Sequence, residues 1–361
     1  MKRPYSLGRM LLNFIIYNFS LRMSFTTINK IQLPQVIFGT SCLGNLYQAI
    51  PYEAKLAIVR ECIINSDGIP MFDSAGKYGA GLALETLGKC LNDLQVRPDE
   101  VLISNKLGWY QTELTTPEPN FEKGVWKDIR NDAIQKISYL GILDCFQQGN
   151  VLLGNYHAQL LSVHDPDEYI ATAKNKTEED KLYNDILEAY RALHELKAEN
   201  KIAAIGVGSK DWRLIQRISK DVSLDWVMVA NSLTLHSHPA DLIEFIADLN
   251  DKNVTVINSA VFNGGFLIGS DFYNYKEVDR SKEEGIVLYN WRDAFFELCK
   301  QFNIQAAEAC FNYGFNIPGV KSVALNTSKP ENVKKNIHMA TKKVPKEFWV
   351  AMVDQGLLDK L

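Results

Sequence analysis

From residue 35 to the end of the chain, short apolar runs rich in β-branched residues alternate with longer segments of helical period. This alternation predicts a parallel sheet whose strands are connected by helices. Eight strands are expected, at 36–39, 69–73, 101–106, 160–164, 202–207, 226–230, 254–258 and 320–325. Eight strand–helix units in roughly 320 residues favour a single α/β domain, a closed (β/α)8 TIM barrel, because a doubly wound sheet usually has fewer strands or a second domain.

The clearest helix is predicted between the fourth and fifth strands. Its apolar residues recur at intervals of four, three, four and three, which places a single apolar stripe on one helix face. These residues are Leu182, Ile186, Ala189, Leu193 and Leu196. Thr177 precedes three acidic residues, so we expect it to be the N-cap of a helix with an acidic first turn.

Two long irregular stretches interrupt the alternation, at 107–127 and 263–284. They follow the third and seventh predicted strands, so both start at the carboxyl end of the barrel, where barrel enzymes place their sites. Loops of this length in a compact domain are usually functional. We therefore expect long functional loops after strands three and seven.

The first 22 residues fit no element of the barrel. Basic residues precede an apolar run at 10–17, as in a signal peptide, but Asn13 and Asn18 interrupt the apolar stretch. No small-residue cleavage site follows, and the run is too short to span a bilayer. A start of translation at Met23 would also explain the segment. We treat 1–22 as an N-terminal extension and 23–361 as the barrel.

Composition places the chain among ordinary globular proteins. It has 39 basic and 43 acidic side chains, a formal charge of −4, and 46% apolar residues. A balance of this kind argues against a nucleic-acid partner, and the apolar content argues against disorder. The six cysteines are scattered singly, which is typical of reduced thiols and predicts a cytoplasmic protein. No membrane partner is expected.

Polar residues at the predicted strand ends form one candidate site. Asp73, Lys106 and His164 end strands two, three and four, and Tyr78 follows Asp73 by five residues. A lysine inside a barrel is costly unless a carboxylate neutralises it, and Asp73 is the natural partner of Lys106. We expect the ammonium to push Tyr78 toward tyrosinate from its usual pKa of about 10, which would make Tyr78 a proton donor or acceptor. His164 could hold a substrate oxygen. Taken singly, each of these residues is also compatible with a cap, a turn or a solvent-facing charge.

Two other kinds of site fit the sequence less well. A dinucleotide-binding GxGxxG turn fails, because Leu84 stands where the third glycine should be. His236 and His238 could suggest a metal site, but among the other histidines only His164 lies near a strand end. We expect the pair to lie in a solvated loop that opens a helix at Pro239, and we expect no metal.

Five motifs together resemble the aldo-keto reductases. They are GTSCLG at 39–44, FDSAGKYG at 72–79, SNK at 104–106, SVHDPD at 162–167 and IGVGS at 205–209, in register with the family along 35–340. The stretch 137–169 is similar to the branch that contains L-fucose, D-threo-aldose and L-galactose dehydrogenases. The resemblance implies a (β/α)8 barrel and a catalytic tetrad at Asp73, Tyr78, Lys106 and His164. It also implies a nicotinamide cofactor held by Gly39, Thr40, Ser41, Ser209, Asn231, Phe262, Asn263, Gly265, Leu267, Asn326, Thr327, Asn332 and Asn336.

The last strand departs from the family pattern. Members that prefer NADPH often clamp the ribose 2′-phosphate with a Lys-Ser pair and a later Arg. Here Asn326, Thr327 and Asn332 occupy these positions. A phosphate dianion would lose its charge-assisted partners, so the resemblance predicts that NAD is preferred over NADP. The lysines that could reverse the preference are Lys329, Lys334 and Lys335.

The branch and the cofactor together predict an aldose 1-dehydrogenase. It would oxidise the anomeric carbon of a sugar to an aldonolactone, with Tyr78 as the general acid and base. Aromatic side chains of the long loop after strand three, Trp109, Tyr110 and Trp126, could cover the sugar ring or pack the loop. Two alternatives remain: a general NADPH-dependent aldehyde or ketone reductase, and a nicotinamide-binding regulatory subunit. A monomer or a homodimer fits either function.

Overall fold

The computed structural model describes residues 26–28 and 31–359, so the predicted extension 1–22 lies outside the described residues. A short antiparallel hairpin comes first, with β1 (Thr26–Ile28) paired to β2 (Ile31–Leu33). Across this described part of the chain, no helix is long and apolar enough to cross a membrane.

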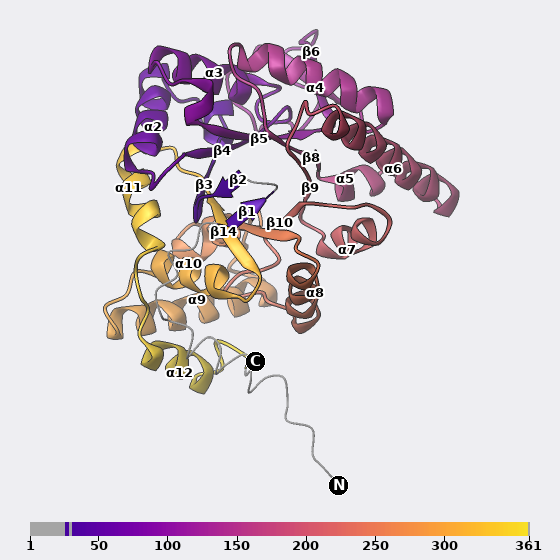
Figure 1. The fold of residues 1–361 in the computed structure, drawn as a ribbon. Helices are drawn as coiled ribbons and strands as arrows, with labels where there is room; N and C mark the ends of the chain where they lie inside the picture. Colours follow the sequence, from indigo (N-terminus) through magenta and orange to yellow (C-terminus); the bar gives the residue numbers. More distant parts are fainter. Residues whose placement is uncertain (1–25, 29–30, 360–361) are drawn as a thin grey trace.

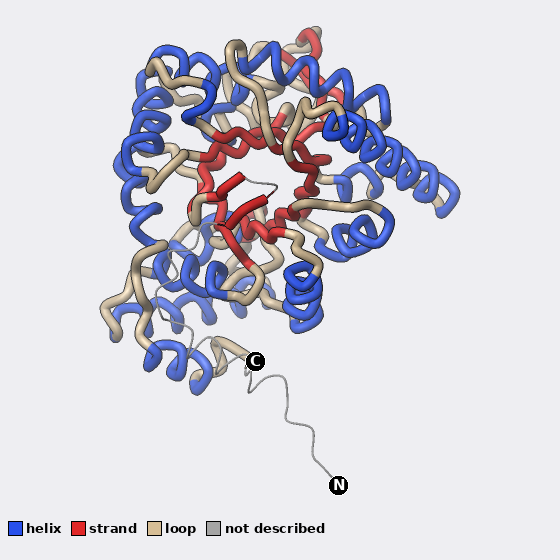
Figure 2. Tube along the Cα trace, viewed as in Figure 1, coloured by secondary structure: helices blue, strands red, loops and turns tan. Residues whose placement is uncertain are grey.

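Eight parallel strands close into a barrel, in the order β10-β11-β14-β3-β4-β5-β8-β9, and form the ring of Figure 2. They are β3 (Val36–Gly39), β4 (Met71–Ala75), β5 (Leu102–Leu107), β8 (Leu160–His164), β9 (Ala204–Ser209), β10 (Trp226–Ala230), β11 (Thr255–Ser259) and β14 (Val320–Leu325). The first and last barrel strands pair through Val36 and Val323. The predicted TIM barrel and all eight predicted strands are confirmed, although β4 and β9 start and end two residues later than expected.

Helices surround the barrel on the outside (Figures 1 and 2). Seven follow the first six barrel strands: α2 (Tyr52–Asn65), α3 (Leu82–Asp93), α4 (Tyr139–Leu153), the short α5 (Pro166–Ile170), α6 (Lys176–Ala198), α7 (Trp212–Asp221) and α8 (Ala240–Asp251). Two lie between the last two barrel strands, α9 (Glu283–Gln301) and α10 (Ala306–Asn316), and α11 (Pro330–Met339) and α12 (Lys346–Asp354) follow the last. Short 3-10 turns occur at η1 (Ser41–Gly44) and η2 (Pro98–Glu100).

The barrel interior has its own apolar cluster, separate from the larger core between strands and helices. Trp226 is completely buried there, among Ile37, Met71 and Ile257. Gly206 on the neighbouring strand makes room for it, because a Cβ at this position would lie 2.2 Å from the Trp226 indole. Leu33 belongs to the same cluster, so the first hairpin packs against the end of the barrel where the strands begin.

The helix α6 has the predicted apolar stripe but a different cap. Asn175 is the N-cap, and its side-chain oxygen accepts a hydrogen bond from the amide of Glu178 at 3.0 Å. Thr177 lies inside the first turn, so the prediction of a Thr177 cap is wrong by two positions. Asn and Thr are both favourable N-cap residues. Asn175 has the extended backbone that an N-cap requires, whereas Thr177 already lies within the helix.

The two long loops contain structure of their own. The loop after β5, the third barrel strand, forms an antiparallel hairpin of β6 (Trp109–Glu113) and β7 (Asn131–Gln135), with residues 114–130 between the strands; we call it the strand-three loop. The loop after β11, the seventh barrel strand, contains the 3-10 segment η3 (Asn263–Ile268) and a small hairpin of β12 (Phe272–Tyr273) and β13 (Lys276–Glu277); we call it the strand-seven loop. Both begin at the end of the barrel where the strands terminate, which we call the barrel mouth.

Candidate active site

The four predicted catalytic residues meet at the barrel mouth. Asp73 lies on β4, Lys106 on β5 and His164 at the end of β8, and Tyr78 stands in the turn between β4 and α3. Asp73, Lys106 and His164 are almost completely buried. The parallel register places the ends of these adjacent strands side by side, which is why residues so distant in sequence come together.

Asp73 is the centre of a hydrogen-bonded group. One carboxylate oxygen accepts from the Lys106 ammonium, and the other accepts from the Ser104 hydroxyl at 2.7 Å. The predicted Asp73–Lys106 pairing is therefore present. Burial opposes the charge of Lys106, but Asp73 and Tyr78 together outweigh burial and raise the pKa of Lys106. The ammonium also donates to the Tyr78 hydroxyl at 3.2 Å.

The pKa of Tyr78 moves opposite to the expectation. The Tyr78 side chain is half-buried, and desolvation of its phenol raises the pKa above the usual value of 10. Lys106 lowers the pKa through its charge and its hydrogen bond, but Asp73 cancels part of that effect. The expectation was wrong because it counted the ammonium and neglected both burial and the carboxylate that neutralises the ammonium.

His164 faces the edge of the Tyr78 ring. The two rings are T-shaped, with their centroids 5.5 Å apart. Burial and the charges of Lys106 and Lys77 lower the pKa of His164 well below its usual 6.5, so the imidazole is neutral at physiological pH. Its Nδ1 is buried and has no partner within the described protein. A neutral imidazole can donate one hydrogen bond to a substrate oxygen.

The three predicted aromatic residues of the strand-three loop do not all lie on the same side of the loop. Trp126 packs on Tyr78 with ring centroids 5.8 Å apart, and Trp109 belongs to the same apolar cluster. Tyr110 points to the opposite side of β6, where the Lys136 ammonium lies 4.1 Å from its ring centroid. The small apolar cluster of the loop therefore contains Trp126, Trp109 and Tyr78, whereas Tyr110 packs against the main core on the other face of β6.

Three predicted cofactor residues with neutral polar side chains lie at or just beyond the ends of β9, β10 and β11. Ser209 ends β9 and donates its hydroxyl proton to Asp167 at 2.6 Å. Asn231 and Asn263 follow the next two strands in left-handed backbone conformations, and their side-chain oxygens are buried without a partner among the described residues. These two oxygens can accept hydrogen bonds from a molecule that is not part of the chain.

The η3 segment carries the remaining predicted cofactor residues of the strand-seven loop. Leu267 is buried, Phe262 caps the segment, and Gly265 has a positive φ. Between them, Gly264 is required by a close approach, because a Cβ there would lie 2.9 Å from the amide nitrogen of Tyr275. The small hairpin thus folds back tightly against η3.

The predicted residues of the last and first strands lie together. Asn326, just after β14, donates to the Ser41 hydroxyl at 2.8 Å, and Gly39 lies close to Asn326. Thr40 is buried and bonds to the Asp73 carbonyl at 3.1 Å. Six further residues lie on the β14–α11 side. Thr327, Asn332 and Asn336 are half-buried, and Lys329, Lys334 and Lys335 are exposed.

Sequence reasoning missed a group of charged residues beside the tetrad. Lys77, only 3% exposed, lies 2.8 Å from Glu122, 2.6 Å from Glu168 and 3.5 Å from Asp165. Lys210 contacts the same Asp165 and Glu168, at 3.4 and 2.6 Å. We call these five residues the lysine network. One feature of the sequence indicates this network: Lys77 directly precedes Tyr78, and Asp165 directly follows His164.

Tyr275 is a second residue that the sequence did not reveal. It lies at the turn of the β12–β13 hairpin and is 43% exposed, and the partial desolvation of its phenol raises the pKa above its usual value. The charges of Tyr78, Lys210 and Tyr47 also act on it, so the hairpin reaches the site. Phe272 of the same hairpin stacks on Tyr47, with centroids 6.5 Å apart.

The two histidines after β10 are not in a solvated loop. His236 is half-buried, bonded to the Tyr273 hydroxyl at 2.9 Å and packed on Trp291, and His238 packs on Tyr313. The expectation failed because the hairpin of the strand-seven loop covers this segment. Among residues 26–28 and 31–359, no group of His, Cys, Asp and Glu could hold a metal ion.

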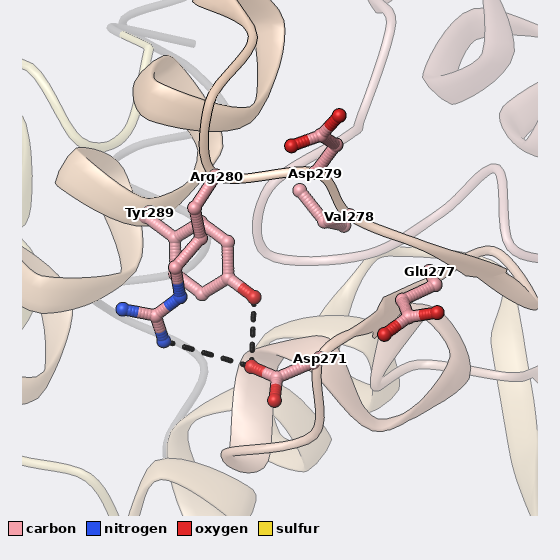
Figure 3. Close-up of a pocket in the computed structure, with 6 residues that line it drawn as sticks. All are labelled: Asp271, Glu277, Val278, Asp279, Arg280 and Tyr289. Carbon is pink, nitrogen blue, oxygen red and sulfur yellow. Dashed lines mark hydrogen bonds and ion pairs between the residues drawn. The ribbon is translucent and has the colours of Figure 1, made fainter.

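A cavity of about 460 Å³ lies between the strand-seven loop and α9. Figure 3 shows the six residues that line it. Asp271 bonds to the Tyr289 hydroxyl at 2.7 Å and lies 3.6 Å from Arg280. None of the predicted site residues lines this cavity.

Comparison with known proteins agrees with this geometry. The model of the aldo/keto reductase family matches residues 35–355. The chain belongs to the aldo/keto reductase family. This aldo/keto reductase is an oxidoreductase and uses a nicotinamide nucleotide, as the family does.

Its relatives are distant. It is 25% identical to pyridoxal 4-dehydrogenase of Microbacterium luteolum over 334 residues, 89% of this chain and 93% of the relative. It is 24% identical to D-threo-aldose 1-dehydrogenase of a Pseudomonas species over 339 residues, 90% of this chain and 95% of the relative.

Two solved structures share the fold. A glycerol dehydrogenase of Gluconobacter oxydans is 17% identical, with a TM-score of 0.66 and coverage of 91% of this chain and 94% of the other. An aldo-keto reductase of Bacillus halodurans is 18% identical, with a TM-score of 0.67 and coverage of 94% and 98%.

Proposed function

We propose that this aldo/keto reductase is an NAD-dependent aldose 1-dehydrogenase that oxidises the anomeric carbon of a sugar to an aldonolactone. One observation carries the proposal: the Tyr78 hydroxyl lies 3.2 Å from the Lys106 ammonium and beside the neutral His164 ring, at the open end of the barrel. Tyr78, as a proton acceptor, and His164, as a hydrogen-bond donor, can thus both reach one substrate oxygen at the barrel mouth.

The reaction removes two hydrogens from the hemiacetal carbon. The hydroxyl proton goes to the phenolate oxygen of Tyr78, the C1–O bond becomes a carbonyl, and the cyclic hemiacetal becomes a lactone. The nicotinamide, when bound, supplies the acceptor for the hydride that leaves C1. Lys106 stabilises the phenolate by its charge, and His164 donates to the substrate oxygen and holds it near Tyr78.

The neutral side of the mouth fits the cofactor. The buried oxygens of Asn231 and Asn263 need donors, and a carboxamide presents an NH2 group. Ser209, Phe262, Gly265 and Leu267 would complete this side.

The adenosine end of the cofactor would lie at the ends of β3 and β14. Gly39, Thr40 and Ser41 would border it on one side. Asn326, Thr327 and Asn332 carry no charge that could pair with a 2′-phosphate, which favours NAD over NADP, and Asn336 would face the adenine.

The relatives support a hemiacetal substrate. Pyridoxal and aldoses both close to cyclic hemiacetals in water, and the two relatives are named as dehydrogenases of these compounds at the aldehyde-level carbon. A ring substrate also suits Trp126, whose indole packs beside Tyr78 at the mouth, with Trp109 in the same cluster.

The test is reduction of the cofactor by purified protein, followed by absorbance. NAD and NADP are each supplied with L-fucose, D-arabinose, L-galactose and pyridoxal, and with simple alcohols for comparison. We expect sugar-dependent reduction of NAD that is lost in Tyr78→Phe. NADPH-dependent reduction of aldehydes with no sugar oxidation would replace this function with a general carbonyl reductase. Tight cofactor binding without turnover in either direction would indicate a regulatory protein.

A further inference from the structure

The strand-three loop brings the Trp126 indole to Tyr78, and a specific set of contacts holds the indole there. The role of these contacts in binding the substrate ring rests on the proposed function. The main chain on both sides of Trp126 is bonded to the segment after β3: the Tyr47 amide donates to the Val125 carbonyl at 2.8 Å, and the Lys127 amide donates to the Asn45 carbonyl at 3.0 Å. These bonds fix the backbone but leave the orientation of the indole to its side-chain contacts.

Glu122 is the side chain that orients the indole. One of its carboxylate oxygens accepts a hydrogen bond from Trp126 Nε1 at 2.7 Å. The other lies 2.8 Å from the Lys77 ammonium. Glu122 therefore joins the indole of the loop to the residue immediately before Tyr78.

Lys77 is anchored independently of Glu122. Its ammonium also contacts Glu168 at 2.6 Å and Asp165 at 3.5 Å, and Lys210 joins both carboxylates from the other side. The charge of Lys77 stays paired when Glu122 is neutralised, so the lysine network survives the loss of Glu122. The Glu122 contact is the part of the network that reaches the strand-three loop.

The Lys77–Glu122 ion pair and the backbone conformation of Glu122 both carry an energetic cost, which suggests that they serve a function. Lys77 is buried and the Glu122 side chain is 30% exposed, so desolvation of the lysine offsets much of the attraction between them; the best-supported use of such a pair is to fix one geometry among several. Glu122 also has a positive φ of 43°, which an L-residue rarely adopts. Neither feature is needed to pack a surface loop, and both aim one carboxylate at Lys77 and Trp126.

We propose that Lys77 and Glu122 are positioning residues that set substrate specificity by holding the Trp126 indole against the Tyr78 ring. Ring-shaped substrates then gain a flat apolar wall beside the reacting carbon. Open-chain substrates of three carbons do not reach the wall and do not depend on it. Neither residue touches the reacting atoms.

The deciding variant is Glu122→Gln. The amide oxygen still accepts from Trp126 Nε1, but the side chain no longer pairs with Lys77 as an ion. The matched control is Glu118→Gln, an exposed glutamate of the same loop that makes no ion pair in the described structure. Circular dichroism and thermal melting of both variants show that the barrel is intact. Glu122→Asp serves as a second variant, since it keeps the charge but is too short to span both partners.

Steady-state kinetics compares a ring-bearing substrate with an open-chain one. We expect Glu122→Gln to raise KM for the best pyranose about tenfold, equivalent to about 1.4 kcal/mol, with kcat changed less than about twofold. KM for glyceraldehyde, measured in the reducing direction, is expected to stay within about twofold of that of the unaltered protein. Glu118→Gln is expected to change neither.

Failure of this inference is separable from failure of the proposed function. If the unaltered protein oxidises no sugar, the proposed function fails, and the same comparison is made with pyridine-4-carbaldehyde as the ring and glyceraldehyde as the open chain. If Glu122→Gln and Glu122→Asp affect ring and open-chain substrates alike, or affect neither, the positioning role is wrong. A loss confined to kcat would also overturn it, because it would place Glu122 in the chemical step.

Discussion

The two sides of the barrel mouth are built on different principles. At the ends of β4, β5 and β8, charged side chains are buried and paired: Asp73 with Lys106, and Lys77 with three carboxylates. At the ends of β10 and β11, the polar side chains are neutral, and the amide oxygens of Asn231 and Asn263 have no partner among the described residues.

The difference separates two tasks. A proton-transfer group needs its charges fixed before the substrate arrives, since reorganisation during the reaction is costly. A binding surface for a neutral amide needs acceptors that stay open until the ligand supplies donors. We assign proton transfer to the charged side and cofactor binding to the neutral side, so substitutions on the two sides are expected to have different effects.

The largest effect is expected on the charged side, from Tyr78→Phe. Removing the hydroxyl removes the proton acceptor, and we expect kcat for sugar oxidation to fall by about 10²- to 10⁴-fold. Tyr110→Phe is the control, because Tyr110 lies on the opposite face of β6. Steady-state rates of both variants check this, and a Tyr78→Phe enzyme within tenfold of the unaltered one would refute the assignment.

Asp73→Asn is expected to destabilise the fold itself. It leaves the Lys106 ammonium buried without its counter-charge, which costs about 3–5 kcal/mol. Lys106→Met together with Asp73→Asn is expected to recover part of this loss, because no unpaired charge then remains. Urea unfolding of the single and double variants measures the free energies. Equal stability of Asp73→Asn and the unaltered protein would mean that the pair is not buried as described.

Nucleotide preference is expected to change when positive charge is added after β14, where we place the adenosine end of the cofactor. Asn326→Lys with Asn332→Arg restores the two cations of members that prefer NADPH. We expect KM for NADP to fall about 10- to 100-fold, with KM for NAD changed little, since a charge-assisted bond to phosphate is worth about 1.5–3 kcal/mol. A protein that already prefers NADP before substitution would contradict the account of the last strand.

The smallest effect is expected from Asn231→Gly. Glycine suits the positive φ of 61° at this position, and the substitution removes an oxygen that has no internal partner. We expect stability without cofactor to change by less than about 1 kcal/mol, while the Kd for NAD rises about five- to tenfold with the loss of one hydrogen bond. Thermal melting with and without NAD separates the two effects. A large loss of stability in the free protein would show that Asn231 has a structural role.

What the sequence could predict follows from periodicity and from strand ends. The eight strands could be predicted because their apolar runs are short and recur along the chain. Asp73, Lys106 and His164 could be predicted as site residues because each lies at or near the end of such a run. The Glu122–Lys77 contact could not be predicted, because the loop that carries Glu122 has no period. The direction of the Tyr78 pKa also required the structure, since burial, not the neighbouring charge, dominates it.

The most direct test of the central claim is the pH dependence of kcat/KM for sugar oxidation. Burial raises the pKa of Tyr78 above 10, so the phenolate is scarce at neutral pH and increases with pH. The account predicts a rate that rises about tenfold per pH unit from pH 6 to 9 without levelling. Reduction of the corresponding carbonyl, which needs the protonated phenol, stays flat over this range. An oxidation rate that is independent of pH from 6 upward would contradict the assignment of Tyr78 as the proton acceptor.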